Sequence, residues 1–269
     1  TVSAMDRLVS YGNTILQAEH GELASGLIGE GRMAEPEHII GSLEDHFKKK
    51  TELDGKKVLI TAGPTLENID PVRFISNHSS GRMGMALAKE AAARGACVFL
   101  IHGPVTVPVP DHPQITSSRV QSAREMYEAC RKIHPETDLS IFAAAVSDYA
   151  PRHAAPGKIR KKEASLSLEL VRNPDIAAEL GNMKQKHQVH IGFALETEDE
   201  LDHARSKLRA KHLDLIVLNS LRDEGAGFGH ATNRITILGK DNQTKKYPLK
   251  SKEEVASDIL DYVMDLRTS

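Results

Sequence analysis

The sequence predicts an α/β protein built on a mainly parallel sheet with helices on both faces. Short apolar runs alternate with amphipathic stretches from residue 56 onward, the pattern of strands joined by crossover helices. The first run, residues 58–60, reaches Gly63-Pro64, which is typical of a buried strand that stops at a turn. After a polar loop at 65–79, apolar residues at helical spacing indicate a helix.

Local signals justify the individual elements along the chain. Gly95 lies just beyond the last turn of the first helix. Ser122 and Glu125 form a capping-box pair at the start of the second helix. Asn173 is a candidate cap for the third, with Pro174 at its first position. The predicted elements, Rossmann-like in their alternation, are strands at 57–62, 97–102, 139–145, 190–195, 213–218 and 234–238, and helices at 81–94, 122–134, 174–181, 198–211 and 252–266.

The bulk composition bounds the class of protein. A length of 269 residues with 40% hydrophobic residues allows one large domain plus an appendage. The net charge of −2 gives no electrostatic case for nucleic acid or for an acidic membrane surface. We find no signal peptide and no apolar run long enough to span a bilayer, so we expect a cytoplasmic protein. Cys97 and Cys130 are expected to be buried free thiols.

Residues 1–50 differ from the rest of the chain. Residues 21–31 are rich in glycine, and Pro36 is the first residue of a predicted helix. A segment of this size cannot bury a core alone. It is therefore either a docked or disordered arm or the tail of another domain, and residues 51–269 are predicted to form the main domain.

The polar loop and the helix after it form a candidate anion site. Strand, loop and helix, with hydroxyls and a glycine at the helix start, present backbone N–H groups to an anion. Neither Gly-x-x-x-x-Gly-Lys-[Ser/Thr] nor Gly-x-Gly-x-x-Gly follows the first strand, which argues against a P-loop NTPase and weakens a nicotinamide dehydrogenase interpretation. The polar side chains of the loop are those of Asn68, Asp70, Arg73, Asn77, His78, Ser79 and Ser80.

A run of small residues, 143–145, follows a strand and precedes Asp148. Small side chains such as Ala144 let a ligand lie against the backbone at the carboxyl end of a strand. Asp148 could hold Mg²⁺, which binds carboxylate and phosphate oxygens. It could equally cap the next turn, and the residues alone favour neither interpretation.

Lysines supply candidate charges for a phosphate group. Lys158 begins the densest basic cluster, 158–162, which is either a solvated face or a hinged loop over a triphosphate. Lys207 and Lys211 share one face of a predicted helix, either as solvated lysines or beneath a polyphosphate. Phe193, beside a glycine, is either a core residue or a base-stacking platform.

Six segments carry a family likeness: Ile-Thr-Ala-Gly-Pro-Thr (60–65), Asp-Pro-Val-Arg-Phe-Ile-Ser-Asn-His-Ser-Ser-Gly-Arg-Met-Gly (70–84), Ala-Ala-Val-Ser-Asp-Tyr (144–149), Lys-Ile-Arg-Lys (158–161), Asn-Pro-Asp-Ile (173–176) and Gly-Phe-Ala-Leu-Glu-Thr (192–197). Together they resemble the phosphopantothenoylcysteine synthetase family, the ligase half of a bifunctional coenzyme A biosynthesis protein. The resemblance implies CTP-dependent condensation of 4′-phosphopantothenate with L-cysteine through an acyl cytidylate, with release of pyrophosphate and CMP. It also implies a homodimer with sites near the subunit interface.

The same resemblance assigns roles to residues. The triphosphate and its Mg²⁺ would lie near Asp148, Lys158, Lys207 and Lys211, with Asp148 as the metal ligand. Lys158 would stabilise the charge that develops during activation. Asn77 would bind the acyl cytidylate, and Arg73 would help to hold the phosphopantothenate end. The nucleotide pocket would be lined by Ala144, Pro174, Asp175, Ile176, Ala177 and Phe193.

Segments 21–26 and 31–36 resemble the C-terminal end of the partner phosphopantothenoylcysteine decarboxylase family, a flavodoxin-like FMN protein. That family commonly has Ala-Cys-Gly-Asp where residues 24–27 read Ala-Ser-Gly-Leu, so its usual acid cysteine is replaced by Ser25. We therefore expect neither FMN binding nor decarboxylase activity. The expected partner in the full-length protein is a decarboxylase domain.

Two other functions compete with the ligase. A nicotinamide-dependent oxidoreductase could use a similar sheet, but the missing dinucleotide fingerprint counts against it. A non-catalytic nucleotide-sensing module is disfavoured because Asn77, Asp148 and Lys158 are all present.

Overall fold

The structure, a computed structural model, divides the chain into two compact units, Thr1–Lys49 and Lys50–Ser269. The residues that the structure describes are 4–5, 7–8, 15–16, 18–22, 28–47, 51–160, 165–196, 200–220, 230–240 and 243–268.

The first unit contains a hairpin and a helix. Strands β1 (Glu19–Glu22) and β2 (Ile28–Arg32) pair antiparallel, and helix α2 (Pro36–Phe47) comes after them. Pro36 is the first residue of α2, as predicted, because proline has no N–H to lose at that position. Part of the segment that resembles the decarboxylase family, residues 23–27, lies outside the described residues.

The second unit is organised around an eight-stranded sheet with the order β15-β14-β12-β11-β8-β3-β6-β7. The strands from β12 to β7 are parallel, whereas β14 and β15 form an antiparallel edge. The parallel strands read as apolar runs because both faces are covered. Their bounds are β3 Lys57–Ala62, β6 Cys97–His102, β7 Ile115–Arg119, β8 Leu139–Phe142, β11 Val189–Glu196, β12 Leu215–Ser220, β14 Ile235–Gly239 and β15 Thr244–Lys246.

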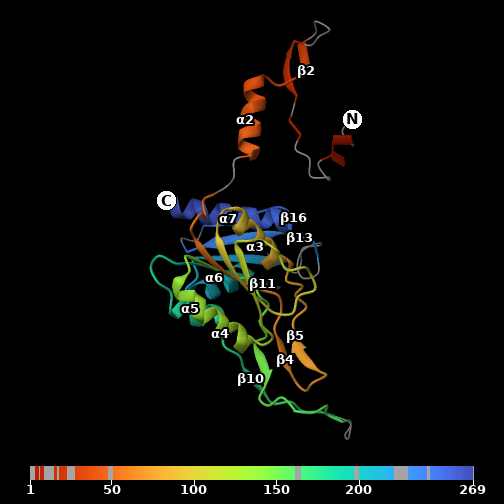
Figure 1. Cartoon of the computed structure of the whole chain (residues 1–269), viewed down its shortest axis with the longest axis vertical. Helices are drawn as coiled ribbons and strands as arrows, with labels where there is room; N and C mark the ends of the chain where they lie inside the picture. Colours follow the sequence, from red (N-terminus) through yellow and green to blue (C-terminus); the bar gives the residue numbers. More distant parts are fainter. Residues whose placement is uncertain are drawn as a thin grey trace. The chain divides into compact units, whose positions relative to one another are not determined.

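Helices cover both faces of this sheet, so the predicted Rossmann-like fold is confirmed. Alternate side chains along β3 enter different cores: Val58 and Ile60 pack with α3 and α7, and Leu59 packs with α4, α5 and α6. Figure 1 shows α3 and α7 near each other and α4 and α5 farther down the same unit. The helices are α3 Arg82–Ala93, α4 Ala123–Ile133, α5 Ile176–Asn182, α6 Glu200–Ala210 and α7 Lys252–Thr268, with a short 3-10 turn η1 at His134–Glu136.

Among the described residues of the second unit, three short antiparallel strand pairs stand outside the main sheet. They pair β4 (Leu66–Asn68) with β5 (Phe74–Ser76), β9 (Tyr149–Pro151) with β10 (Leu170–Arg172), and β13 (Thr232–Asn233) with β16 (Lys250–Ser251). None of them was predicted. All three are short pairs with mostly polar or exposed residues, so they lack a strong hydrophobic period.

The predictions for one cysteine and for the start of one helix were wrong. Cys97 is an exposed free thiol, because it lies at the first position of β6; Cys130 is free and buried as predicted, and burial raises its pKa to about 12. The helix predicted from Pro174 begins instead at Ile176. Within the described residues, no helix combines the length and the apolar character that a bilayer crossing requires.

Candidate active site

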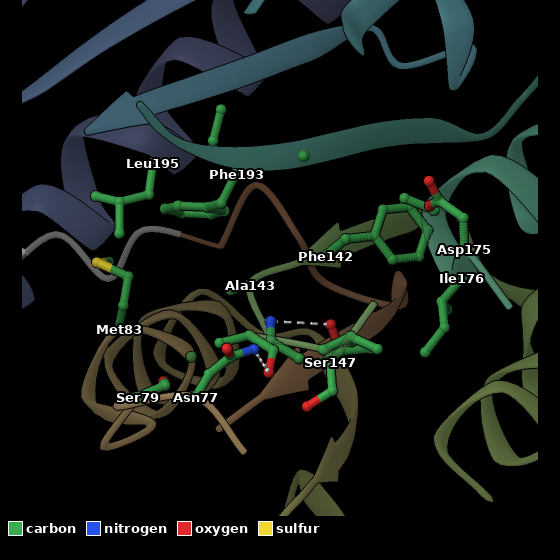
Figure 2. Close-up of a pocket in the computed structure, with 18 of the residues that line it drawn as sticks. Asn77, Ser79, Met83, Phe142, Ala143, Ser147, Asp175, Ile176, Phe193 and Leu195 are labelled. Carbon is green, nitrogen blue, oxygen red and sulfur yellow. Dashed lines mark hydrogen bonds between the residues drawn. The ribbon is translucent and has the colours of Figure 1, made fainter. Parts of the chain in front are cut away.

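A cavity of about 630 Å³ lies at the carboxyl ends of the central strands. Its walls come from the start of α3, the segment after β8, the start of α5, the end of β11 and one face of α6. Figure 2 shows Phe142 and Ala143 at the centre, Met83 and Leu195 on one side, and Asp175 and Ile176 on the other. An open α/β sheet binds ligands at this edge.

The segment after β8 is fixed against β3 and the residue after it by hydrogen bonds from its main-chain N–H groups. The Ala144 N–H donates to Thr61 Oγ1 at 3.2 Å, and the Ala145 N–H donates to the Gly63 carbonyl at 2.9 Å. The small residues at 143–145, which include the predicted site residue Ala144, line the cavity. The predicted strand at 139–145 therefore ends at Phe142, and the remaining residues form the cavity floor.

Asn77, which lies between β5 and α3, contacts the same segment after β8. Its Nδ2 donates a hydrogen bond to the Ala145 carbonyl at 2.9 Å, and its side chain remains exposed on the cavity wall (Figure 2). A side-chain amide held in this way keeps its oxygen and second N–H in a fixed orientation. Asn77 can therefore serve as a pre-oriented polar contact for a ligand.

The α3 backbone approaches the sheet closely at the cavity. Gly81 adopts a φ of 83°, a left-handed conformation that favours glycine. A Cβ added at Gly84 would lie 3.0 Å from Ala62 Cα and closer still to its Cβ. Glycine at both positions lets α3 begin directly against β3 and face the cavity.

The residues just before α5 form another wall of the cavity. Asp175, and not Asn173, caps the helix, since its Oδ1 accepts from the Ala178 N–H at 3.1 Å. Asn173 Nδ2 instead donates to the Ser147 carbonyl at 2.8 Å. The predicted nucleotide-lining residues Pro174, Asp175, Ile176 and Ala177 all line the cavity, as does Phe193.

Two of the three predicted phosphate-binding lysines line the same cavity. Lys207 lies on α6 and Lys211 comes directly after its last residue, Ala210; Lys211 Nζ lies 3.0 Å from Asp175 Oδ2. The Asp148 side chain is exposed on the cavity wall. The described residues hold no group of three His, Cys, Asp or Glu side chains able to bind a metal. A single carboxylate fits Mg²⁺ that is held mainly by substrate phosphates and water.

Lys158 and Arg73 do not line the cavity of the single chain, contrary to the expectation of one shared site. The cause is the buried carboxylate of Asp70. Its Oδ2 accepts from Arg73 Nε at 3.0 Å and from the Ile159 N–H at 3.1 Å, while Arg73 also donates to the Ile159 carbonyl at 2.8 Å. These contacts hold residues 158–160 against the β4–β5 hairpin.

Asp70 is ionised under ordinary conditions. Burial alone would raise the pKa of its carboxyl group, but hydrogen bonds from the N–H groups of Val72 and Ile159 and from Arg73 outweigh burial and hold that pKa well below its usual range. The anchored loop thus depends on a charged, fully hydrogen-bonded carboxylate.

Several polar residues that line the cavity were not predicted as site residues, among them Arg82, Arg172, Glu179, Asn219, Asn233 and Lys252. The Asn219 Oδ1 atom is buried and has no hydrogen-bond partner among the described residues, so it is a candidate ligand contact. Its position directly after the apolar run of β12 was an available signal. No sequence pattern indicated Asn233 or Lys252. Asn233 lies in β13 and Lys252 follows β16, and the pairing of these two strands was not predictable from the sequence.

Together, the fold and the cavity define a Rossmann-like ligand-binding domain with cations, a carboxylate and an oriented amide at the ends of its strands. Residues 53–266 match the family described as DNA/pantothenate metabolism flavoprotein C-terminal domain. The chain belongs to that family. The resemblance to one half of a bifunctional coenzyme A biosynthesis protein, drawn from the sequence, is confirmed at the level of the family.

Similar proteins carry two kinds of name. The chain is 54% identical over 263 residues to a cysteine/cysteine sulfinic acid decarboxylase of an unknown prokaryotic organism, covering 96% of this chain and 73% of that protein. It is 45% identical over 263 residues to the coenzyme A biosynthesis bifunctional protein CoaBC of Bacillus subtilis (strain 168), covering 96% of this chain and 64% of that protein. The chain thus spans less than two thirds of this bifunctional relative.

Solved structures share the fold. The C-terminal domain of a coenzyme A biosynthesis bifunctional protein CoaBC is 38% identical, with a TM-score of 0.69 over 81% of this chain and 98% of that chain. The DNA/pantothenate metabolism flavoprotein of Streptococcus pneumoniae is 25% identical, with a TM-score of 0.68 over 78% of this chain and 99% of that chain. A Cab2 variant in complex with phosphopantothenate-cysteine is 17% identical, with a TM-score of 0.61 over 86% of this chain and 95% of that chain.

Proposed function

We propose that this domain joins 4′-phosphopantothenate to L-cysteine at the expense of CTP, as a step of coenzyme A biosynthesis in the cytoplasm. The observation that carries the proposal is the cavity that brings Asn77, Asp148, Lys207 and Lys211 together at the strand ends. The CoaBC relatives and the phosphopantothenate-cysteine complex of a structural neighbour support the choice of substrates.

The reaction would proceed in two steps. A carboxylate oxygen of phosphopantothenate attacks the α-phosphorus of CTP, forms a P–O bond and expels pyrophosphate. The cysteine amine then attacks the acyl carbon, forms the amide, loses a proton and expels CMP. The first step brings two anions together, so cationic and hydrogen-bond-donating groups must lower the cost of their approach.

The nucleotide would occupy the side of the cavity formed by α5 and α6. Phe193 offers an aromatic face for the base, and residues 174–177 shape the pocket around it. Lys207 and Lys211 would neutralise phosphate oxygens, and Lys211 can exchange its Asp175 partner for the ligand. Asp148 would hold Mg²⁺, which, when bound, screens the phosphate charges and favours departure of pyrophosphate.

Asn77 would bind the acyl cytidylate at the centre of the cavity. Its amide already lies at the contact of the segment between β5 and α3 with the segment after β8, between the two sides. A donor placed in advance at the reacting centre needs no reorganisation during the reaction.

Lys158 and Arg73 would act in a homodimer. In the single chain, the loop at 158–160 lies outside the cavity, yet the hairpins next to it expose apolar side chains, which is typical of a protein interface. A second copy that covers these hairpins could bring residues 158–160 towards a cavity, where Lys158 would stabilise charge on the activated phosphate. The exposed apolar residues are Val72, Phe74, Tyr149 and Leu170.

The experiment supplies the chain with CTP, Mg²⁺, 4′-phosphopantothenate and L-cysteine and identifies the products by mass spectrometry. The proposal requires phosphopantothenoylcysteine, CMP and pyrophosphate in equal amounts. A parallel reaction with cysteine sulfinic acid alone tests the activity named for the 54% identical relative. Decarboxylation of that amino acid without ligation by the folded chain would replace the proposal. In the full-length protein we propose a decarboxylase domain as covalent partner.

A further inference from the structure

The segment that carries Lys158 is fixed at two points to the turn of the β4–β5 hairpin. Before Lys158, the Ala155 N–H donates to the Ile69 carbonyl at 2.9 Å. After Lys158, the Ile159 N–H donates to Asp70 Oδ2 at 3.1 Å. The two acceptors belong to adjacent residues of the chain, so both ends of the segment are held by the same turn.

The three residues between these bonds, 156–158, form an exposed arc, whereas Ala155 and Ile159 are half-buried. The ring of Pro156 fixes its φ angle. A Cβ added at Gly157 would meet no atom of the described chain within 4 Å. An exposed arc of this kind takes its position from its two ends, so the backbone position of Lys158 depends on the bonds to the hairpin turn.

Asp70 joins the turn and the segment through one carboxylate, and its side chain is 0% exposed. Its Oδ1 accepts from the main-chain N–H groups of Val72 and Arg73, both at 2.8 Å, which closes the turn. Its Oδ2 accepts from Arg73 Nε at 3.0 Å and from the Ile159 N–H. Arg73 completes the contact by donating to the Ile159 carbonyl at 2.8 Å. The contact with the segment therefore depends on Oδ2, while Oδ1 serves the turn.

The same hairpin leads to Asn77, which directly follows β5 and donates to the Ala145 carbonyl. The end of β5 is itself fixed, because Ser76 Oγ donates to the Thr65 carbonyl at 2.8 Å. The β4–β5 hairpin thus connects the amide at the centre of the cavity with the segment that carries Lys158. A support of this kind is what positioned functional side chains require.

We infer that Asp70 is the positioning residue for Lys158: its buried carboxylate holds the segment at 155–159 on the hairpin turn and so fixes the backbone from which Lys158 extends. The inference rests on the proposed function, in which Lys158 stabilises the charge that develops during the attack on CTP. Asp70 acts through Lys158 and not on a substrate. A backbone that is fixed in advance lowers the entropic cost of placing a charge at the reacting centre.

Asp70→Asn tests the inference on the intact chain. The substitution keeps the shape of the side chain but leaves one acceptor oxygen, which cannot satisfy the donors of both the turn and the segment. Asp70→Asn, Lys158→Gln and the double variant are compared by single-turnover release of pyrophosphate from CTP with 4′-phosphopantothenate and Mg²⁺. Glu67→Gln is the matched control, because Glu67 is a buried carboxylate of the same hairpin that accepts from the Ala123 N–H of α4 at 2.9 Å.

We expect Asp70→Asn to slow pyrophosphate release by about tenfold and to leave the half-saturating CTP concentration within about twofold of the wild type. Lys158→Gln should slow release by about a hundredfold. In that background, Asp70→Asn should change the rate by less than about twofold, because a positioning residue has no effect without the residue that it positions. Glu67→Gln should keep the wild-type rate.

Hydrogen exchange of the Ile159 amide, followed by NMR, measures the anchoring without catalysis. The amide should exchange about tenfold faster or more in Asp70→Asn than in the wild type or in Glu67→Gln, since its acceptor is lost. Thermal unfolding identifies a variant that does not fold. Ile159→Pro then replaces Asp70→Asn in the rate measurements, because it removes the donating N–H and leaves the hairpin sequence unchanged.

The outcomes separate the inference from the proposed function. A wild-type rate in folded Asp70→Asn, an equal loss in Glu67→Gln, or an equal loss with and without Lys158 would each overturn the inference and leave the proposed function in place. If the folded wild-type chain releases no pyrophosphate from CTP, the proposed function fails, and the role of Asp70 in activation fails with it.

Discussion

The side-chain amide of Asn77 donates a hydrogen bond to the main-chain carbonyl of Ala145, 2.9 Å away. This bond connects the segment between β5 and α3 with the segment after β8, a strand that pairs with β3 in the sheet. The Ala145 N–H in turn donates to the Gly63 carbonyl. The centre of the cavity is therefore a cross-linked junction of two loops, and the amide of Asn77 is oriented before any ligand enters.

Asn77→Ala should impair the chemistry more than nucleotide binding. Removal of one positioned hydrogen-bond donor at a reacting centre typically costs about a hundredfold in rate. We expect product formation to fall by about that factor while CTP binding stays close to the wild-type value. Single-turnover product analysis and calorimetry measure the two quantities. Asn182→Ala, at an exposed residue outside the cavity, is the control, and a normal rate in Asn77→Ala would remove Asn77 from the site.

Lys207→Gln and Lys211→Gln should each weaken CTP binding by about tenfold, because each removes a cation from the nucleotide end of the cavity. The loss should shrink at high salt, since screening weakens the original interaction. Titration calorimetry at two salt concentrations measures it. Arg209→Gln is the matched control on the same helix, at an exposed residue outside the cavity. An equal loss in the control would mean that only the overall charge of α6 matters.

Gly84→Ala should destabilise the domain by about 1–3 kcal/mol, because the added methyl group overlaps Ala62 and forces α3 away from β3. Urea unfolding measures the change in the free energy of unfolding. Gly157→Ala is the control, since nothing lies within 4 Å of the Cβ that it adds. Equal stability of the two variants would contradict the close approach of α3 to the sheet.

Sequence patterns were sufficient to predict the central strands of the sheet but not the edge strand β7. The predicted strands at 57–62 and 97–102 match β3 and β6 in both bounds, because buried parallel strands read as continuous apolar runs ended by turn residues. Strand β7, Ile115–Arg119, was missed, since its last four residues are exposed and three of them are Thr or Ser. An edge strand of this kind has one paired side and no hydrophobic period.

The cavity residues that directly follow strand ends could be predicted from the sequence. Those that are positioned by contacts between distant segments could not. The spacing of Lys207 and Lys211 placed them on one face of a predicted helix, and only the family resemblance assigned them to a nucleotide site. The anchoring of residues 158–160 by Asp70 joins positions 89 residues apart, and no local pattern encodes it. Arg94 is a further case: it is buried and pairs with Asp261 at 2.7 Å, a contact between α3 and α7 that spacing alone does not reveal.

The buried pair His134 and His190 should make stability depend on pH. Their Nε2 atoms lie 3.0 Å apart. Burial lowers the pKa of His190 to about 3, with help from Lys184, His134 and Lys240 and against the charge of Asp214. Burial also lowers the pKa of His134. An unfolded histidine near its ordinary pKa of 6.5 binds a proton that the folded one does not.

The contribution of His190 to the free energy of unfolding is therefore fully present above about pH 7. It falls as the pH drops from 6.5 towards 3, by about 1 kcal/mol per pH unit. Chemical unfolding at several pH values measures the slope. His190→Gln should flatten it, whereas His187→Gln, at an exposed residue, should leave it unchanged. A His190→Gln slope equal to that of the wild type would show that other groups control the acid response.

The central claim is that this cavity activates a carboxylate at the α-phosphorus of CTP, and isotope exchange between labelled pyrophosphate and CTP tests it most directly. With cysteine omitted, we predict label incorporation into CTP that requires both 4′-phosphopantothenate and Mg²⁺ and that Asn77→Ala strongly reduces. Exchange without phosphopantothenate, or turnover that yields CDP and inorganic phosphate instead of pyrophosphate, would contradict the claim.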